Sequence, residues 1–372
     1  MPAPEPRYGF LSDALAAADA AAFVTVGSRE NPTLRYLARV DRPGTFAFVY
    51  VDGDACLLAP AGSLAGARRA FPGEHVYGPD EVDGAAVGQR VASVLDSYGV
   101  SGPVLTPRTV PHDTAVYLER AGHPVSSTDA VHEERREKTR EEVRCVARAG
   151  DAAAAALAEA RSLLADADPI EGGRKLAVDG RTLTTGVLRR ELNAALAERG
   201  CEGGETTVVA GRGAADPTFS GDVPLEPGAP VALALAPRGP RGYHAALTRT
   251  LSPATEGGWD RRAGLAVESA LDVGLGEIAA GVSLRSVDAE MRAELASFGL
   301  ADDAIPTLAS GGVGLAAWES PSTDSTLLAG DTVAVRIGIA DPERGPVRFA
   351  ETVRVTEEGY DVLTDAERSL VP

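Results

Sequence analysis

The sequence has 372 residues, 44% of them hydrophobic, and a formal net charge of −18. A chain of this length exceeds what one hydrophobic core usually organises, so we expect two domains. The acidic balance argues against nucleic acid and anionic membrane surfaces as direct partners, and no stretch approaches the roughly 20 apolar residues of a transmembrane helix.

The basic residues are unevenly chosen. Lys138 and Lys175 are the two lysines, so 34 of the 36 basic residues are arginine. Excess carboxylate with almost no lysine is typical of proteins from salt-loving or GC-rich organisms, where acidic side chains keep the surface hydrated. We therefore interpret the charge as an adaptation to the solvent rather than as a functional acidic patch.

The beginning of the sequence and the cysteines indicate the compartment. Residues 1–19 carry acids and prolines, and they lack the basic start and apolar centre of a signal peptide, which predicts a cytoplasmic location. Cys56, Cys145 and Cys201 lie far apart without a CxxC pair. This spacing favours buried free thiols over a disulfide framework or a structural zinc site.

Helical and strand-like runs alternate over residues 1–130, which predicts an α/β domain. A polar, charged stretch at 126–140 suits a linker that runs into a helix. The expected helices are 13–22 and 81–97, and the expected strands are 23–26, 45–51, 55–58 and 103–106, with a hairpin between the second and third of these strands.

A second domain is expected over residues 131–372. Thr139 and Glu142 form a capping-box pattern, and apolar residues then recur at helical spacing, which predicts a long helix to about Ala165. Further helices are expected at 185–199, 261–279 and 287–297, and strands at 207–210, 231–236, 246–251, 332–339 and 347–356. No P-loop and no complete GxGxxG accompanies these elements.

Residues 234–250 read ALAPRGPRGYHAALTRT. This segment resembles a hallmark of the methionine aminopeptidase, prolidase and creatinase family. In that family one strand supplies an aspartate, a Gly-Tyr turn follows, and a second strand places another aspartate before Thr-Arg-Thr. The frame is present here, but both aspartate positions are alanine, Ala234 and Ala246.

Four more segments resemble family signatures in the expected order. Residues 310–319 resemble a Gly-His-Gly run followed by His-Glu; residues 333–338 and 347–353 resemble two strands that each carry a metal-binding glutamate; and residues 214–219 resemble a loop with a catalytic histidine. By this resemblance Gly311, Arg336 and Ala350 stand at metal-ligand positions, Trp318 at a substrate-contacting histidine and Thr218 at the catalytic histidine.

The resemblance implies a fold and a consequence for the chemistry. It implies a creatinase/prolidase-like α/β N-terminal domain, an α+β pita-bread C-terminal domain and a homodimer. Active relatives use two divalent metals such as manganese or cobalt, which need several carboxylate ligands. The positions Ala234, Ala246, Gly311, Arg336 and Ala350 offer none, so we expect no metal and no other cofactor.

The leading hypothesis is a non-catalytic relative of Xaa-Pro aminopeptidases that binds a peptide or a small carboxylate in its cleft. Candidate cleft residues are Tyr243, His244, Trp318, Glu319, Arg336 and Glu351. We expect Arg336 to pair with Glu351, although a ligand carboxylate is the alternative partner. Trp318 suits either an apolar pocket or a packed core.

Two other hypotheses remain. One is an enzyme, either an Xaa-Pro aminopeptidase or dipeptidase with an atypical metal centre or a creatinase-like hydrolase that uses His244 as acid and base. A turn histidine without a catalytic role is the expected reading of His244. The other hypothesis is a structural subunit that dimerises with an active paralogue.

Overall fold

The computed structural model describes residues 6–211, 221–300, 309–341 and 343–372. It divides into two compact units, Met1–Arg135 and Arg136–Pro372, while the sequence places the boundary between residues 130 and 131. Thr218, expected at the position of a catalytic histidine, lies outside the described residues, as does the segment 214–219. The described part of the chain contains no helix long and apolar enough to cross a membrane.

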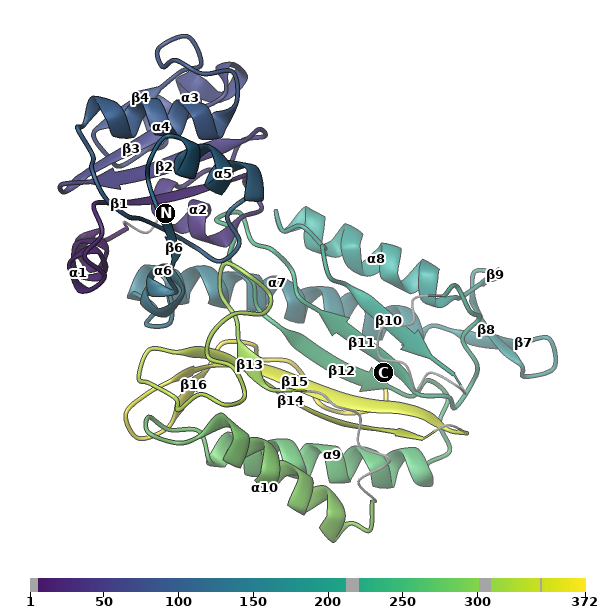
Figure 1. The fold of residues 1–372 in the computed structure, drawn as a ribbon. Helices are drawn as coiled ribbons and strands as arrows, with labels where there is room; N and C mark the ends of the chain where they lie inside the picture. Colours follow the sequence, from purple (N-terminus) through teal and green to yellow (C-terminus); the bar gives the residue numbers. More distant parts are fainter. Residues whose placement is uncertain (1–5, 212–220, 301–308, 342) are drawn as a thin grey trace. The chain divides into compact units, whose positions relative to one another are not determined.

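The first unit is built on a six-stranded sheet in the order β4-β3-β2-β1-β5-β6 (Figure 1). The pairs β1–β2 and β2–β3 are antiparallel, whereas the pairs β3–β4, β1–β5 and β5–β6 are parallel. The strands are β1 Ala22–Gly27, β2 Phe46–Val51, β3 Asp54–Leu58, β4 His75–Tyr77, β5 Val104–Thr106 and β6 Val125–Ser127.

Alternating side chains of this sheet enter two separate cores. Phe48 belongs to one hydrophobic cluster and its neighbour Val49 to the other, because successive residues of a strand point to opposite faces. Both faces are therefore buried, as an α/β domain requires. The helices of the unit are α1 Gly9–Ala17, α2 Pro32–Ala38, the 3-10 turn η1 Ala61–Ser63, α3 Leu64–Ala70, α4 Val87–Ser97, α5 His112–Arg120 and α6 Ala130–Glu134.

Three elements of the first unit differ from the sequence-based prediction. The helix expected at 81–97 is α4, which begins only at Val87. The helix expected at 13–22 is α1, which ends at Ala17 because Asp19 adopts a positive φ of 48°. The stretch 126–140 is not a plain linker, since it contains the end of β6 and the short helix α6. The alanine-rich stretch extended the predicted helix to residue 22, but the backbone conformation of Asp19 is not helical.

The second unit contains a seven-stranded antiparallel sheet. Its order is β10-β11-β12-β15-β14-β13, with β16 on β15, and a small sheet β7-β8-β9 stands beside it (Figure 1). The strands are β7 Asp168–Ile170, β8 Lys175–Val178, β9 Arg181–Thr182, β10 Thr207–Ala210, β11 Val231–Leu235, β12 Leu247–Leu251, β13 Gly311–Gly312, β14 Thr332–Asp341, β15 Gly345–Val355 and β16 Tyr360–Val362.

Helices cover the two halves of this sheet in pairs (Figure 1). α7 Arg140–Ala165 and α8 Thr185–Glu198 share one hydrophobic core with β10 to β12. α9 Trp259–Gly276 and α10 Leu284–Ser297 share another with β14 and β15. The predicted capping box is confirmed, because Thr139 accepts from the Glu142 backbone and Glu142 accepts from that of Thr139. The sheet thus keeps one face under helices in both halves.

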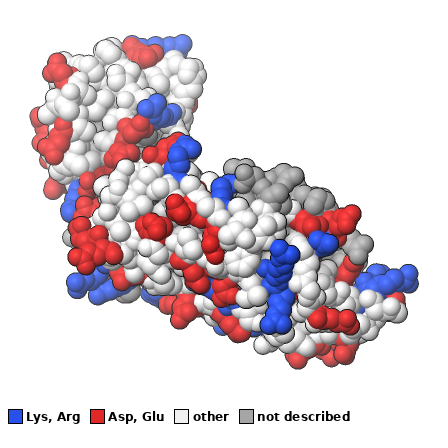
Figure 2. Space-filling model, turned by 90° about the horizontal axis from the view of Figure 1, so that it is seen from below, with Lys and Arg blue, Asp and Glu red and all other residues white. Residues whose placement is uncertain are grey.

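Many acidic side chains lie on the surface, and the three cysteines lie in the interior. On the face shown in Figure 2, acidic side chains are scattered among uncharged residues rather than gathered in one place. Cys56, Cys145 and Cys201 are buried free thiols, as predicted. Burial is the largest cause that raises the pKa of all three, so they stay protonated at neutral pH.

Candidate functional site

One row of paired residues crosses five strands of the second unit. The register joins Thr207 to Ala234, Ala234 to Thr248, Thr248 to Ala350 and Ala350 to Arg336. Residues directly opposite each other on antiparallel strands project from the same face. All five line a single cavity of about 420 Å³. The row therefore defines the floor of a site on the sheet.

The structure brings four of the five expected metal-ligand positions to this cavity, Ala234, Ala246, Arg336 and Ala350. Ala246 also lines it, two residues before Thr248 on the same face. Gly311 stands on β13 opposite Ala334 instead. A methyl group added at Gly311 would lie 3.8 Å from the Trp318 ring, so the glycine stands beside the wall of the cavity.

Arg336 is a cation of the cavity lining and is only 9% exposed. Its guanidinium carbon lies 3.7 Å from the centroid of the Trp318 ring, a cation–π contact. Nη1 donates to the carbonyl oxygens of Ala309 at 3.4 Å and Ala334 at 3.3 Å. Burial lowers the pKa of Arg336 to about 10, against the opposing effect of Asp288 and Glu205. Arg336 therefore carries its charge at neutral pH.

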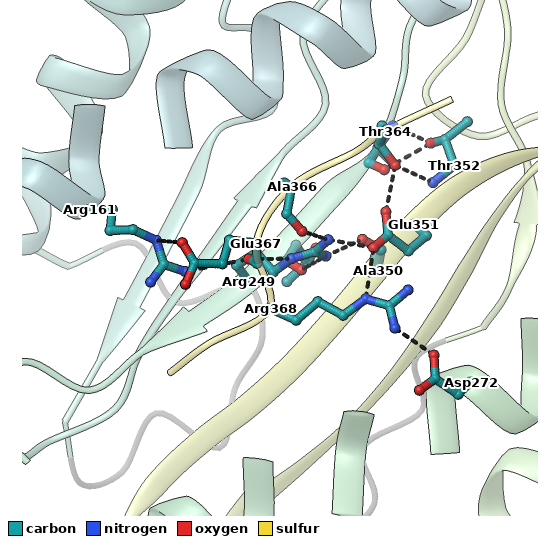
Figure 3. A network of polar contacts seen from close by, with 12 residues as sticks. Arg161, Arg249, Asp272, Ala350, Glu351, Thr352, Thr364, Ala366, Glu367 and Arg368 are labelled. Atoms are coloured by element: carbon teal, nitrogen blue, oxygen red, sulfur yellow. Dashed lines mark hydrogen bonds and ion pairs between the residues drawn. The ribbon is translucent and has the colours of Figure 1, made fainter. Parts of the chain in front are cut away.

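The predicted pair between Arg336 and Glu351 is wrong. Glu351 follows Ala350 on β15, so its side chain projects from the opposite face of the sheet. There it pairs with Arg249 and with Arg368, whose Nε lies 3.2 Å from Oε1 (Figure 3). Thr364 donates a further hydrogen bond of 2.8 Å to Oε2. Glu351 thus belongs to a buried network and not to the cavity lining.

Trp318 and Glu319 are adjacent in sequence but have different surroundings. Trp318 lines the cavity and is 56% exposed, which agrees with the pocket reading rather than the packed core. The side chain of Glu319 is only 4% exposed and forms an ion pair of 2.8 Å with Lys138. The carboxylate is therefore compensated by a lysine, away from the lining.

Tyr243 and His244 are also engaged elsewhere. The Tyr243 hydroxyl donates a 2.7 Å hydrogen bond to Glu142 in the buried interior. His244 has Nδ1 3.1 Å from the Ala236 carbonyl oxygen, and its backbone N–H donates to Gly314 at 2.6 Å. Burial lowers the pKa of His244, which keeps the imidazole neutral. Neither residue is among those that line the cavity.

The structure adds lining residues that sequence reasoning missed. Arg348 is 6% exposed and shares the cavity with Arg336, and Glu205 is exposed beside them. Arg348 stands two residues before Ala350, so strand alternation would have placed it on the same face. Glu205 precedes β10 in a loop, where no sequence pattern points to the site.

These residues do not fit a pair of divalent ions. Ala234, Ala246 and Ala350 present methyl groups, and Arg336 presents a cation that does not deprotonate at neutral pH. Glu205 is the one carboxylate among the described lining residues. Nowhere in the described ranges do three or more His, Cys, Asp or Glu side chains gather as they would to hold a metal ion.

The chain is similar to a known protein family and to several solved structures. Residues 144–357 match the model of metallopeptidase family M24. Similar solved structures include an Xaa-Pro dipeptidase from Bacillus anthracis, with 21% identity, a TM-score of 0.85 and 98% of each chain covered. The X-Pro aminopeptidase from Thermotoga maritima has 19% identity, a TM-score of 0.83 and 99% of each chain covered.

A third similar structure is the dipeptidase PepE from Mycobacterium ulcerans, with 24% identity and a TM-score of 0.77 over 97% of this chain and 95% of that one. Curated protein sequences give no match. At these identities the structures establish the fold. They confirm the predicted creatinase/prolidase-like N-terminal domain and pita-bread C-terminal domain.

Proposed function

This chain belongs to metallopeptidase family M24, and we propose that it is a non-catalytic member that binds a peptide or a small organic acid in the cavity on its pita-bread sheet. One observation carries the proposal. The residues at four expected metal-ligand positions, Ala234, Ala246, Arg336 and Ala350, line the same cavity without contributing a single carboxylate.

Metal-assisted hydrolysis needs ligands that this lining does not supply. Two adjacent divalent ions require several oxygen ligands, both for coordination and to balance charge, and they generate the nucleophile from bound water. Methyl groups offer no ligand, and the Arg336 guanidinium repels a cation. The side chains at the metal-ligand positions therefore favour the binding of a ligand over metal-assisted hydrolysis.

Metal-free acid–base chemistry has little support from the neighbouring side chains. His244 is held by the Ala236 carbonyl and lies outside the lining. Tyr243 is bonded to Glu142, and burial raises its pKa well above its usual value. Glu319 is paired with Lys138. A general acid or base must reach the reacting group, and these three are committed to other contacts.

The cavity itself supports a binding role. Its volume of about 420 Å³ lies within the ordinary range of ligand pockets. Its walls are mainly small apolar side chains with a half-exposed tryptophan and a few polar groups, the usual make-up of a ligand site.

The first experiment measures metal binding and hydrolysis together. Purified protein is titrated with manganese, cobalt and zinc by calorimetry, and release of the residue before proline is assayed with each metal. We expect neither heat nor product. A matched positive control carries Ala234→Asp, Ala246→Asp, Gly311→His, Arg336→Glu and Ala350→Glu, and we expect it to bind metal. Stoichiometric metal or Xaa-Pro cleavage by the unaltered chain would overturn the proposal.

A further inference from the structure

Arg336 is a buried cation without an acidic partner. The hydrogen bonds of its guanidinium among the described residues go from Nη1 to two carbonyl oxygens at 3.3 and 3.4 Å, and no described carboxylate forms an ion pair with it. A charge taken out of water is costly unless it is paired and hydrogen-bonded. The site therefore has the charge for a ligand anion.

Asp288 and Glu205 raise the pKa of Arg336 through their charges, but neither forms an ion pair with it. Asp288 hydrogen-bonds to Ser310, and burial is the main cause that raises its pKa. Glu205 is exposed, so water screens its charge. Arg348, which is buried, brings a second guanidinium to the same lining. The arginines are thus deep and the carboxylate of the lining is exposed.

The remaining lining is suited to an apolar group. Six alanines (Ala234, Ala236, Ala246, Ala309, Ala317 and Ala350), together with Leu235 and Phe349, line the cavity with the arginines. The indole of Trp318 is more than half exposed while Arg336 lies against it. An inorganic anion would use the guanidinium groups but leave these apolar walls in contact with water.

We propose that the ligand is an organic carboxylate with an apolar body, its carboxylate held by Arg336 and its body packed against the alanines and Trp318. This inference rests on the proposed binding function and names its ligand class. Nε and Nη2 of Arg336 have no hydrogen-bond partner among the described residues, and a guanidinium edge matches a carboxylate with two parallel hydrogen bonds.

Tryptophan fluorescence can report on this site. The sequence has two tryptophans, and Trp259 lies under Arg344 rather than in the cavity. A Trp259→Phe background therefore leaves Trp318 as the single reporter. EDTA-treated protein is titrated with acetate, benzoate, phenylacetate and N-acetyl-phenylalanine, with their neutral amides, and with sulfate.

We expect saturable changes for the carboxylates with apolar bodies, at least about tenfold tighter than for their amides and than for acetate or sulfate. Arg336→Gln should weaken carboxylate binding by about tenfold or more and remove the preference over the amide. Arg336→Lys keeps the charge but loses the planar fork, so it should give an intermediate loss. Circular dichroism verifies that each variant is folded.

Arg344→Gln is the matched control, because Arg344 also lies over an aromatic ring, that of position 259 at 5.6 Å in the unaltered chain, but outside the cavity. It should leave binding unchanged. Equal affinity for acids and amides, equal affinity for sulfate, no binding by any carboxylate, or no effect of Arg336→Gln would overturn the inference. Since metal is absent, these results are independent of the metal and hydrolysis assay that tests the proposed function.

Discussion

The two faces of the pita-bread sheet differ sharply although neighbouring residues form them. On β12, Thr248 lines the cavity while Arg249 lies in the buried network behind it; on β15, Ala350 and Glu351 repeat this arrangement. Behind the sheet each charge has its partners. In the cavity many side chains are small, and Arg336 forms no ion pair with a described acid. The face behind the sheet therefore holds paired charges that stabilise the fold, whereas the cavity face has alanine at three of the expected metal-ligand positions.

The buried network also attaches the end of the chain to the sheet (Figure 3). Arg249 is fully buried and donates to Glu351 and to the carbonyl oxygens of Thr248, Ala350, Ala366 and Glu367. Arg368 links Glu351 to Asp272 on α9. Strand, helix and C-terminal segment are thus joined through one carboxylate.

The largest expected effect comes from breaking this network. Glu351→Gln removes the charge that compensates Arg249 while keeping the size of the side chain. Removing one partner of a buried ion pair costs about 3–5 kcal/mol, because the other charge stays buried. We expect a loss of this size in the free energy of unfolding, measured by urea denaturation.

Two controls separate burial from charge. Glu159→Gln breaks the exposed pair with Arg199 and should cost less than about 1 kcal/mol. The double variant Arg249→Met with Glu351→Leu removes both charges and should be more stable than the sum of the single losses predicts. A Glu351→Gln loss no larger than that of Glu159→Gln would show that the network is not a scaffold.

A smaller effect is expected on the cavity face, where Ala350→Glu places a carboxylate directly opposite Arg336. Opposite charges at such positions contribute about 0.2–1 kcal/mol, so stability should change by less than about 1 kcal/mol in the same urea assay. The new side chain should also act as an internal competitor. We expect it to reduce carboxylate binding, read from Trp318 fluorescence, by about tenfold or more.

Ala350→Gln has the same size without the charge and should reduce binding far less. If both variants block the ligand equally, the effect is steric and the pairing of Arg336 with a carboxylate is contradicted. A loss of several kcal/mol for Ala350→Glu would instead show that the cavity face is packed as tightly as the buried face.

The sequence predicted elements whose signals are local. The capping box of Thr139 and Glu142 located the start of α7, and residues 207–210 coincide with β10. The motif spacing also identified positions that share one cavity. The partners of Glu351, Glu319 and Tyr243 lie about 100 residues or more away in the chain, except for the short link from Glu351 to the C-terminal segment.

Such long-range pairs leave no pattern in a single sequence, because any of many arginines can meet a given carboxylate. The error over Arg336 and Glu351 had a different cause. Both residues stand at or beside motif positions, but Ala350 pairs with Arg336, so Glu351 must face the other way. Strand alternation, applied to both strands together, would have excluded the pair.

The smallest expected effect concerns His244, which belongs neither to the cavity lining nor to the buried network of Glu351. Burial lowers its pKa in the folded state, with Arg238 acting in the same direction and the Ala236 carbonyl, Glu205 and Glu319 opposing. The unfolded chain has the ordinary pKa of about 6.5. As pH falls below that value, the unfolded state takes up a proton before the folded state does, so stability is lost on acidification.

His244→Gln removes this contribution. The unfolding free energy of the unaltered chain, minus that of the variant, should therefore be larger at pH 8 than at pH 5.5, because the titration of all other groups cancels in the difference. His112→Gln, at an exposed position, gives the baseline for removing one imidazole. A difference that does not change with pH would mean that His244 is not held neutral, which would reopen its role as an acid or base.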